Sequence, residues 1–250
     1  MRTSLALALL AILALPGVPA RAFDITQMTD TERAAFDAEV RAYLIANPEI
    51  LIDVSHALQA KQDAAQAQGD AGLIAANAAA IFADSTSFVG GNPKGDITLV
   101  EFLDYRCGYC RKAHQDVANL VKSDGNIRYV VKEFPILGDD SVLASRFAIA
   151  ALRVAGPVAY QKINAGFYES FRGDVTDATL TAFAKELGLD PAPILAEMNS
   201  DAVTQIILAN HTLGEKLQIS GTPTFVLADQ MMRGFVPLDT MRAFVAKARS

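Results

Sequence analysis

The stretch EFLDYRCGYC (residues 101–110) joins an apolar run to the only two cysteines of a 250-residue chain. Residues 97–103 have the pattern of a strand, and residues 110–121 can follow as a helix. This order places Cys107 at a helix N-terminus, where unpaired amides and the helix dipole favour an anion. We therefore expect Cys107 to be an exposed thiolate of low pKa and Cys110, one turn further on, to be the buried resolving thiol.

A C-x-x-C pair can be a redox catalyst, half of a metal site or a structural clip. Zinc needs four ligands, and this chain has no third cysteine and only three histidines, none at a ligand spacing. A structural clip is disfavoured because closing so short a loop removes little entropy from the unfolded chain. Redox exchange is the favoured hypothesis. We expect no metal cofactor, although the reduced thiols could bind the soft ion Cu(I).

Two other positions fit redox chemistry. Glu101 lies in an otherwise apolar strand; a carboxyl buried there would have a raised pKa and could shuttle the proton of Cys110. The alternative is a Glu exposed at a sheet edge, and Asp104 is expected to be a capping or solvent-facing group. Further on, SGTPTF (residues 220–225) puts Pro223 at the start of a strand, which by itself indicates a turn and not a cis bond.

The N-terminus predicts a secretory signal peptide, residues 1–22, with Arg2, an apolar run over 5–15 and small residues before the cleavage site. The apolar run is about half as long as a bilayer-spanning helix, so a retained anchor is the weaker alternative. The mature chain is therefore expected outside the cytoplasm, where disulfides persist. A net charge of −6, with no long basic run, argues against nucleic acid as a partner.

Residues 23–85 form a predicted helical N-terminal region, rich in Ala and Gln. A capping box at 29–32 begins a helix, Asn47-Pro48-Glu49 restarts one, and Gly69 and Gly72 are expected to interrupt before another. A narrow apolar stripe runs along this region: Phe36, Val40, Leu44, Leu51, Val54 and Leu58. The region is either folded back on its own domain or, as we favour, an arm that packs against copies of itself.

A turn-rich stretch at 85–96 places the domain junction just before it. Residues 88–250 then alternate strands and helices, with a second strand at 127–133, a block of helices over about 139–217 and a closing strand pair and helix. The helices of the block are predicted at 141–154, 157–171, 177–187, 191–198 and 201–217, the strands at 224–228 and 231–235, and the last helix at 238–248. This is an α/β domain.

The run 99–102, the Cys107-Gly108-Tyr109-Cys110 motif, the helical block and residues 221–225 together resemble the DsbA-like thiol-disulfide oxidoreductases, across residues 88–250. The resemblance implies a thioredoxin fold with an inserted helical domain, preceded here by a helical arm. It also implies a redox-active disulfide between the cysteines, a cis Pro223 facing the Cys107 sulfur, a Thr222 backbone that binds the substrate strand, and a Glu101 that matches the buried acid of such folds.

The chain departs from the strongly oxidising members, which have Pro-His between the cysteines and Val before the cis-proline. It has Gly108-Tyr109 and Thr222 instead, which are typical of the periplasmic disulfide isomerases. Without a chargeable His beside Cys107, its thiolate is stabilised less, so we expect a milder oxidant.

Within the family, the arm resembles that of the suppressor of copper sensitivity C and Com1-like group, some of which trimerise. The resemblance implies a periplasmic isomerase or reductase of misoxidised secreted proteins, a homotrimer assembled through the arm, a membrane thiol reductase as electron donor, and a link to copper tolerance. The alternatives are a monomeric DsbA-type oxidase and a copper-binding or chaperone protein that uses the same thiols.

Overall fold

The computed structural model describes residues 25–250, and the predicted signal peptide lies outside them. The described chain forms two compact units that divide after Gln59. The helices are η1 (Ile25–Gln27), α1 (Asp30–Ala46), α2 (Glu49–Ala76), α3 (Ala78–Phe82), α4 (Gly108–Asp124), α5 (Asp139–Glu169), α6 (Asp177–Glu186), α7 (Pro191–Glu197), α8 (Asp201–Lys216) and α9 (Leu238–Ala248). The strands are β1 (Phe88–Gly91), β2 (Ile97–Leu103), β3 (Ile127–Glu133), β4 (Thr224–Leu227) and β5 (Gln230–Arg233).

The second unit, residues 60–250, is built on a five-stranded mixed sheet in the order β1-β3-β2-β4-β5. β2 and β3 run parallel and are joined by α4, as a parallel pair requires a crossover; both strands have the bounds that their apolar pattern predicts. The other neighbours are antiparallel. β2 is central and buried on both faces, which explains its nearly continuous apolar sequence.

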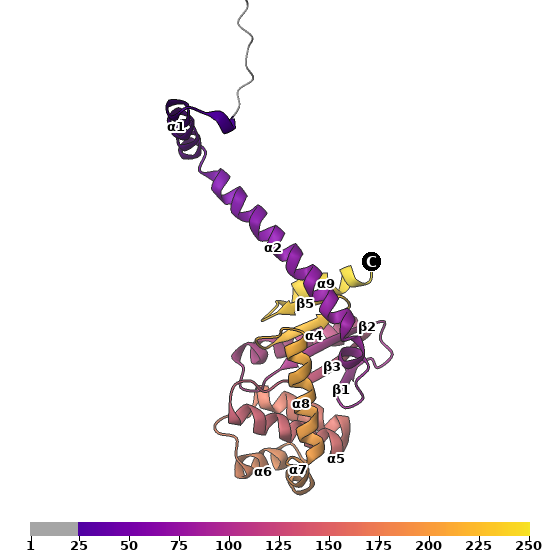
Figure 1. Cartoon of the computed structure of the whole chain (residues 1–250). Helices are drawn as coiled ribbons and strands as arrows, with labels where there is room; N and C mark the ends of the chain where they lie inside the picture. The colour runs from indigo at the N-terminus through magenta and orange to yellow at the C-terminus, as the bar shows by residue number, and fades with distance from the viewer. Residues whose placement is uncertain (1–24) are drawn as a thin grey trace, which may run out of the picture. The chain divides into compact units, whose positions relative to one another are not determined.

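Each face of the sheet is covered by helices, as Figure 1 shows. On one face Leu99 of β2 packs in a cluster with residues of α4 and α9. On the other face Val100 and Phe102 pack with α3, α8 and the end of α2. The alternation of side chains along β2 therefore divides its residues between two cores. Each fully buried Val or Phe contributes about 1.5–3 kcal/mol.

Helices α5 to α8 form the predicted insertion between β3 and β4. α5 contains the two helices predicted there, because Gly156 (φ 82°) breaks the helical backbone just before Pro157. Alone among the described helices, α5 is long and apolar enough to cross a membrane. Its inward residues, however, pack against the rest of the insertion, with Phe147, Tyr160 and Phe167 buried in one core. The described part of the chain therefore has the predicted fold class, a thioredoxin fold with a helical insertion, preceded by helices.

Strand β1 was not predicted, because residues 90–95 have the composition of a turn. The structure shows an edge strand that pairs antiparallel with β3. Gly91 is required by the pairing: its φ is +66°, and a Cβ there would lie 2.4 Å from the carbonyl oxygen of Ile127. A glycine that the strand pairing requires was thus interpreted from the sequence as part of a turn, and the strand was not predicted.

The prediction that Gly69 and Gly72 interrupt a helix was wrong, because α2 continues through both to Ala76. Each glycine weakens a helix by about 1 kcal/mol relative to Ala. Tertiary contacts offset this: Asp70 is buried and pairs with Arg233 of β5 at 2.5 Å, and Ile74 is in the core of the sheet domain. The same contacts explain why the units divide after Gln59, whereas the sequence places the junction just before Ser85.

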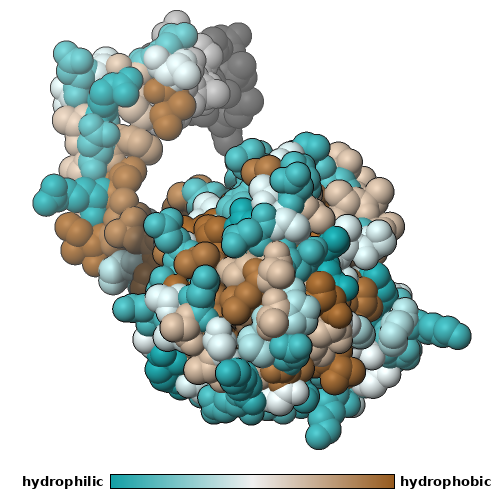
Figure 2. Space-filling view, turned by 90° about the horizontal axis from the view of Figure 1, so that it is seen from below, coloured by the Kyte–Doolittle hydropathy of each residue, from teal (hydrophilic) through white to brown (hydrophobic). Residues whose placement is uncertain are grey.

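The first unit, where the structure describes it, is residues 25–59. α1 begins with the predicted capping box, in which Thr29 and Glu32 each accept from the other's backbone amide. Along α1 and the first part of α2 large apolar side chains are exposed, and Figure 2 shows brown, hydrophobic residues along this arm. They are Phe36, Val40, Tyr43, Ile45, Leu51, Ile52, Val54 and Leu58. These eight residues are called the arm stripe below.

Candidate active site

The loop between β2 and α4 is held by the carboxylate of Asp104. Its two oxygens accept from the backbone amides of Arg106 (2.8 Å), Ile136 (2.8 Å) and Leu137 (3.1 Å) and from the hydroxyl of Ser141 (2.7 Å). Asp104 is fully buried. It therefore caps a turn, as one of the two predictions had it, and the solvent-facing alternative was wrong. This turn places Cys107 as the N-cap residue of α4.

Cys107 is a free thiol with 8% of its surface exposed, less than the sequence predicts. Its pKa is lowered to about 5, first by a hydrogen bond from the Cys110 side chain, and further by the Thr222 side chain and the amides of Cys110 and Tyr109. Burial opposes this lowering. Because the stabilising groups are the resolving thiol, the first turn of α4 and the loop before Pro223, the site stabilises the thiolate with neutral donors.

Cys110 lies one turn into α4 and has no exposed surface. Burial raises its pKa well above the ordinary value, and its hydrogen bond to Cys107 and the charge of Glu101 raise it further. The two sulfurs thus differ strongly in acidity. At neutral pH Cys107 is the nucleophile, and Cys110 needs a base to become one.

Glu101 is a buried carboxyl, 3% exposed, and not an edge residue. Its pKa is raised to about 7, chiefly by burial; a hydrogen bond from the Tyr129 hydroxyl opposes this rise, and the charges of Glu133 and Cys107 add to it. A carboxyl with this pKa exchanges its proton near neutral pH. It interacts electrostatically with both cysteines and has the acidity that a proton acceptor for Cys110 requires.

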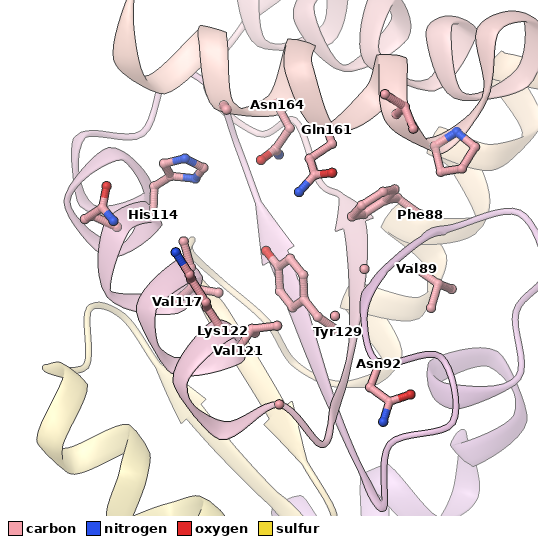
Figure 3. Close-up of a pocket in the computed structure, with 18 of the residues that line it drawn as sticks. Phe88, Val89, Asn92, His114, Val117, Val121, Lys122, Tyr129, Gln161 and Asn164 are labelled. Carbon is pink, nitrogen blue, oxygen red and sulfur yellow. The ribbon is translucent and has the colours of Figure 1, made fainter.

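Tyr129 is a site residue that the sequence did not reveal. In the parallel pairing of β2 with β3, Leu99 lies opposite Tyr129 and Glu101 opposite Val131, so Tyr129 and Glu101 are diagonal neighbours on one face. Tyr129 also lines an open hollow of about 800 Å³ between α4, β1 and α5. Figure 3 shows its ring between His114 and Phe88, with Gln161 and Asn164 above it. Tyr129, which donates a hydrogen bond to Glu101, therefore also borders an open hollow at the surface.

A second buried acid, Glu133, lies at the end of β3 and was also missed. It accepts from the hydroxyls of Tyr105 (2.7 Å), Tyr160 (2.5 Å) and Ser145 (2.7 Å). Burial raises its pKa to about 7, against the lowering effect of these hydrogen bonds. Tyr105 is two residues before Cys107, and Tyr160 and Ser145 belong to α5. Glu133 thus ties the active-site loop to the helical insertion.

The loop before β4 completes the site. The Thr222–Pro223 peptide bond is cis, and the carbonyl oxygen of Thr222 lies 3.1 Å from the Cys107 sulfur. Gly108 and Tyr109 are exposed on the first turn of α4, with 64% of Tyr109 accessible. The structure thus places Cys110, Thr222 and the backbone amide of Tyr109 against the Cys107 sulfur. Gly108 and Pro223 adjoin them in the chain, and Glu101 acts electrostatically on both cysteines. The arrangement can form and resolve a mixed disulfide.

Two family models match the chain, that for thioredoxin over residues 83–247 and that for the copper resistance protein ScsC N-terminal domain over residues 32–65. A thioredoxin-like oxidoreductase from Silicibacter pomeroyi is 37% identical, covering 68% of this chain and 96% of its own, with a TM-score of 0.63. The thiol-disulfide exchange protein α-DsbA2 from Wolbachia pipientis is 27% identical (73% and 97%, TM-score 0.68). A periplasmic thioredoxin-like protein from Salmonella enterica is 27% identical (68% and 94%, TM-score 0.62).

Curated relatives are similar over part of their length. The chain is 27% identical to a putative protein-disulfide oxidoreductase of Rickettsia conorii, covering 66% of this chain and 61% of that protein. It is 29% identical to the Na(+)/H(+) antiporter NhaA 1 of Salinispora arenicola over 64% of this chain, and spans 24% of the length of that relative.

Proposed function

The chain belongs to the thioredoxin family, among the DsbA-like and ScsC-like thiol-disulfide oxidoreductases, and we propose that it acts chiefly as a disulfide isomerase or reductase on misoxidised proteins. The single observation that carries this is the difference between its two thiols: a nucleophilic Cys107 with a pKa of about 5 beside a buried Cys110 whose pKa is raised.

The first step is common to both activities. The Cys107 thiolate attacks one sulfur of a client disulfide, the Cys107–client bond forms, and the other client sulfur leaves as a thiolate. In isomerisation a client thiolate then attacks the mixed disulfide, makes a new client disulfide and returns the Cys107 thiolate. No net oxidation occurs.

In reduction the second step uses Cys110 and Glu101. Cys110 gives its proton to Glu101 and attacks the Cys107 sulfur, which forms the Cys107–Cys110 disulfide and releases the client as a dithiol. Two electrons pass to the client. A membrane thiol reductase, the proposed donor, returns two electrons and two protons to the pair.

The residues around Cys107 favour isomerisation over strong oxidation. Gly108 and Tyr109 carry no charge between the cysteines, so the thiolate is stabilised by hydrogen bonds alone. A pKa of about 5 lies between those of DsbA, about 3.5, and thioredoxin, about 7. A thiolate of intermediate stability leaves the mixed disulfide less readily than that of a strong oxidant, so the pair is less oxidising. The alternative, a monomeric oxidase, requires a more oxidising pair.

The arm stripe supports assembly into a homotrimer. Its residues are 40–68% exposed, and so many exposed large apolar side chains on two successive helices favour an association site. The match of residues 32–65 to the ScsC N-terminal domain falls on the same helices. Several active sites on one assembly would retain a misfolded client while its disulfides are rearranged.

The proposed location is the periplasm. It rests on the signal-peptide pattern of residues 1–22 and on similarity to a periplasmic thioredoxin-like protein. The name of the N-terminal family, a copper resistance protein, supports a link to copper tolerance. Two adjacent free thiols can bind Cu(I) as a cargo, which is the second function proposed for the same pair.

Refolding of ribonuclease separates the two enzymatic readings. An isomerase recovers activity from scrambled ribonuclease faster than it oxidises reduced ribonuclease, whereas an oxidase does the reverse. Cys107→Ala should abolish both activities, and Cys110→Ala should accumulate mixed disulfides with the client. Full activity of Cys107→Ala would refute the mechanism. Greater activity on reduced than on scrambled ribonuclease would favour the oxidase.

A further inference from the structure

Three arginines converge on residues 168–173, where α5 ends. Arg106 donates to the carbonyl oxygen of Gly173 (2.9 Å), and Arg172 to those of Phe171 (2.6 Å) and Glu169 (2.9 Å). Arg111 donates to the carbonyl oxygen of Tyr168. Arg106, Arg111 and Arg172 are called the arginine cluster below.

The arginine cluster is attached to segments that adjoin Cys107 in the chain or pack on its loop. Arg106 directly precedes Cys107, and the amide of Arg111 donates to the Cys107 carbonyl oxygen at 3.1 Å. The segment that holds the cluster packs on the same loop, since the Tyr168 hydroxyl donates to the carbonyl oxygen of Asp104 at 3.3 Å. The three guanidinium groups are therefore held at the end of α5, beside the loop that carries Cys107.

The positive charge of the cluster is only partly compensated. Arg106 lies 3.6 Å from Asp140, but within residues 25–250 no carboxylate lies within 4.0 Å of Arg111 or Arg172 in an ion pair. The nearby carboxylate of Glu169 faces His114 at 3.5 Å. Burial lowers the pKa of Arg111, and the charges of Arg172 and Arg106 lower it further, so Arg111 is repelled by both of the other cations.

Capping of α5 explains only part of this arrangement. Cations near a helix C-terminus are stabilising, because they interact favourably with the helix dipole. A guanidinium has five N–H donors, and the backbone carbonyls occupy few of them. Arg106 and Arg172 are exposed. In a chain of net charge −6, a positive surface beside the active-site loop, with unused donors, has the chemistry of a carboxylate receptor.

We propose that the arginine cluster binds Asp and Glu side chains that flank the target cysteine of a client, so that acidic client segments are the preferred substrates. The inference rests on the proposed function, because it concerns the same sulfur. An exposed carboxylate–guanidinium pair contributes about 0.2–1 kcal/mol, equivalent to a roughly one-and-a-half- to fivefold change in rate. Long-range attraction adds to the encounter rate and weakens with salt.

The test uses three peptides that carry one mixed disulfide and differ only in two flanking residues, Asp, Asn or Lys. Their reaction with the reduced full-length protein is followed at low and high salt. Each rate constant is divided by the rate constant for the reaction of a neutral small dithiol with the same peptide. This ratio corrects for the intrinsic reactivity of the peptide disulfide. We expect Asp to exceed Asn and Asn to exceed Lys, each by about two- to fivefold at low salt, with the differences shrinking at high salt.

The variants locate the effect. Arg172→Gln should lower the Asp-to-Asn rate ratio, and Arg172→Lys should retain most of it. The matched control is Lys94→Gln, which removes the same charge from the exposed turn before β2, at the opposite end of that strand from the active-site loop. An equal loss of the ratio in Lys94→Gln would overturn the assignment to the cluster.

The wild-type comparison needs no variant and is decisive by itself. Equal corrected rates for the three peptides would overturn the inference and leave the proposed function standing. A failure of all three peptides to react with Cys107 would instead count against the proposed function.

Discussion

The sulfur of Cys107 lies 3.1 Å from the carbonyl oxygen of Thr222, the residue that precedes the cis bond to Pro223. The loop before β4 thus contacts the sulfur at the start of α4, although 115 residues separate Thr222 from Cys107 in the chain. As a thiol, Cys107 can donate to this carbonyl. As a thiolate it accepts instead, and the Thr222 side chain is one of the groups that lower its pKa.

Replacing Thr222 with Val should therefore raise the pKa of Cys107 above about 5. A hydrogen bond to a charged group contributes about 1.5 kcal/mol or more, so the thiolate should become roughly tenfold easier to protonate. Thr222→Ser keeps the hydroxyl and is the matched control. The measurement is the pH titration of thiolate absorbance in the ultraviolet. Equal titration curves for Val and Ser would contradict the role of the hydroxyl.

Glu101→Gln should slow resolution of the mixed disulfide without preventing its formation. The amide cannot take the proton of Cys110, and a positioned base contributes about 10²-fold or more. In the wild type, release of the client should accelerate as the pH rises through about 7, the pKa of Glu101. In the variant this rise should disappear. Attack by Cys107 on the same client is the internal control, and a normal release rate would remove Glu101 from the mechanism.

Tyr129→Phe tests whether the hydroxyl from the hollow of Figure 3 sets the acidity of Glu101. Its hydrogen bond lowers the pKa of Glu101 against the effect of burial, so its loss should raise that pKa. The pH midpoint for client release should move upward from about 7. Tyr43→Phe, which removes an exposed hydroxyl from α1, should leave the midpoint in place. An unchanged midpoint in Tyr129→Phe would show that Tyr129 is a packing residue only.

Local pattern predicted the elements that hold the cysteines, because strand alternation and helix start signals act over a few residues. β2 and β3 have the predicted bounds, and Glu101 stands out as an acid in an apolar strand. The contacts of Glu101 and Glu133 were not predictable in this way. Tyr129 reaches Glu101 through the register of a parallel pair, and the hydroxyls of Ser145 and Tyr160 reach Glu133 only when α5 folds back.

The arginine cluster could not be predicted from the sequence for the same reason, because it forms only when distant segments fold together. Arg106 and Arg111 are close in the sequence, but Arg172 joins them from the far end of α5.

In the helical arm the sequence predicted a helix break that the structure does not have. Gly69 and Gly72 have weak helix propensity, and burial of Asp70 and Ile74 overrides it. Propensity decides a helix end only where packing does not.

Glu133 should make the protein less stable as the pH rises. Its pKa is raised from 4.5 to about 7 in the folded state, so its contribution is fully present below pH 4.5 and is lost as the pH rises through about 7. The loss is on the order of 3 kcal/mol at most. The measurement is the free energy of unfolding in urea, which should decline between pH 5 and pH 8. Glu133→Gln should reduce this decline, and the remaining Glu101, with a similar pKa, should account for part of what is left.

This comparison is made in a background with both cysteines replaced by Ala. The thiolate of Cys107 acts in the opposite direction, because its lowered pKa gives stability that is lost as the pH falls through about 5. Exposed Glu186→Gln is the control. A decline of equal size in Glu133→Gln and the control would show that Glu133 does not titrate as proposed.

The arm stripe should hold the proposed trimer together, and the structure shows how to test this without damaging the catalytic unit. Deletion must stop at Gln59, because Ile74 and Ile81 are buried in the sheet domain and their loss would cost about 2–5 kcal/mol each.

The sharper variant is Leu51→Glu with Leu58→Glu, which places two charges in the arm stripe. Ala60→Glu puts a charge about two and a half helical turns beyond Leu51, on the opposite side of α2 from that residue. Native mass should fall from trimer to monomer in the double variant and remain that of a trimer in Ala60→Glu. Isomerisation of scrambled ribonuclease should fall with it, while Cys107 reacts with a small disulfide as before. A wild-type chain that is already monomeric would refute the trimer.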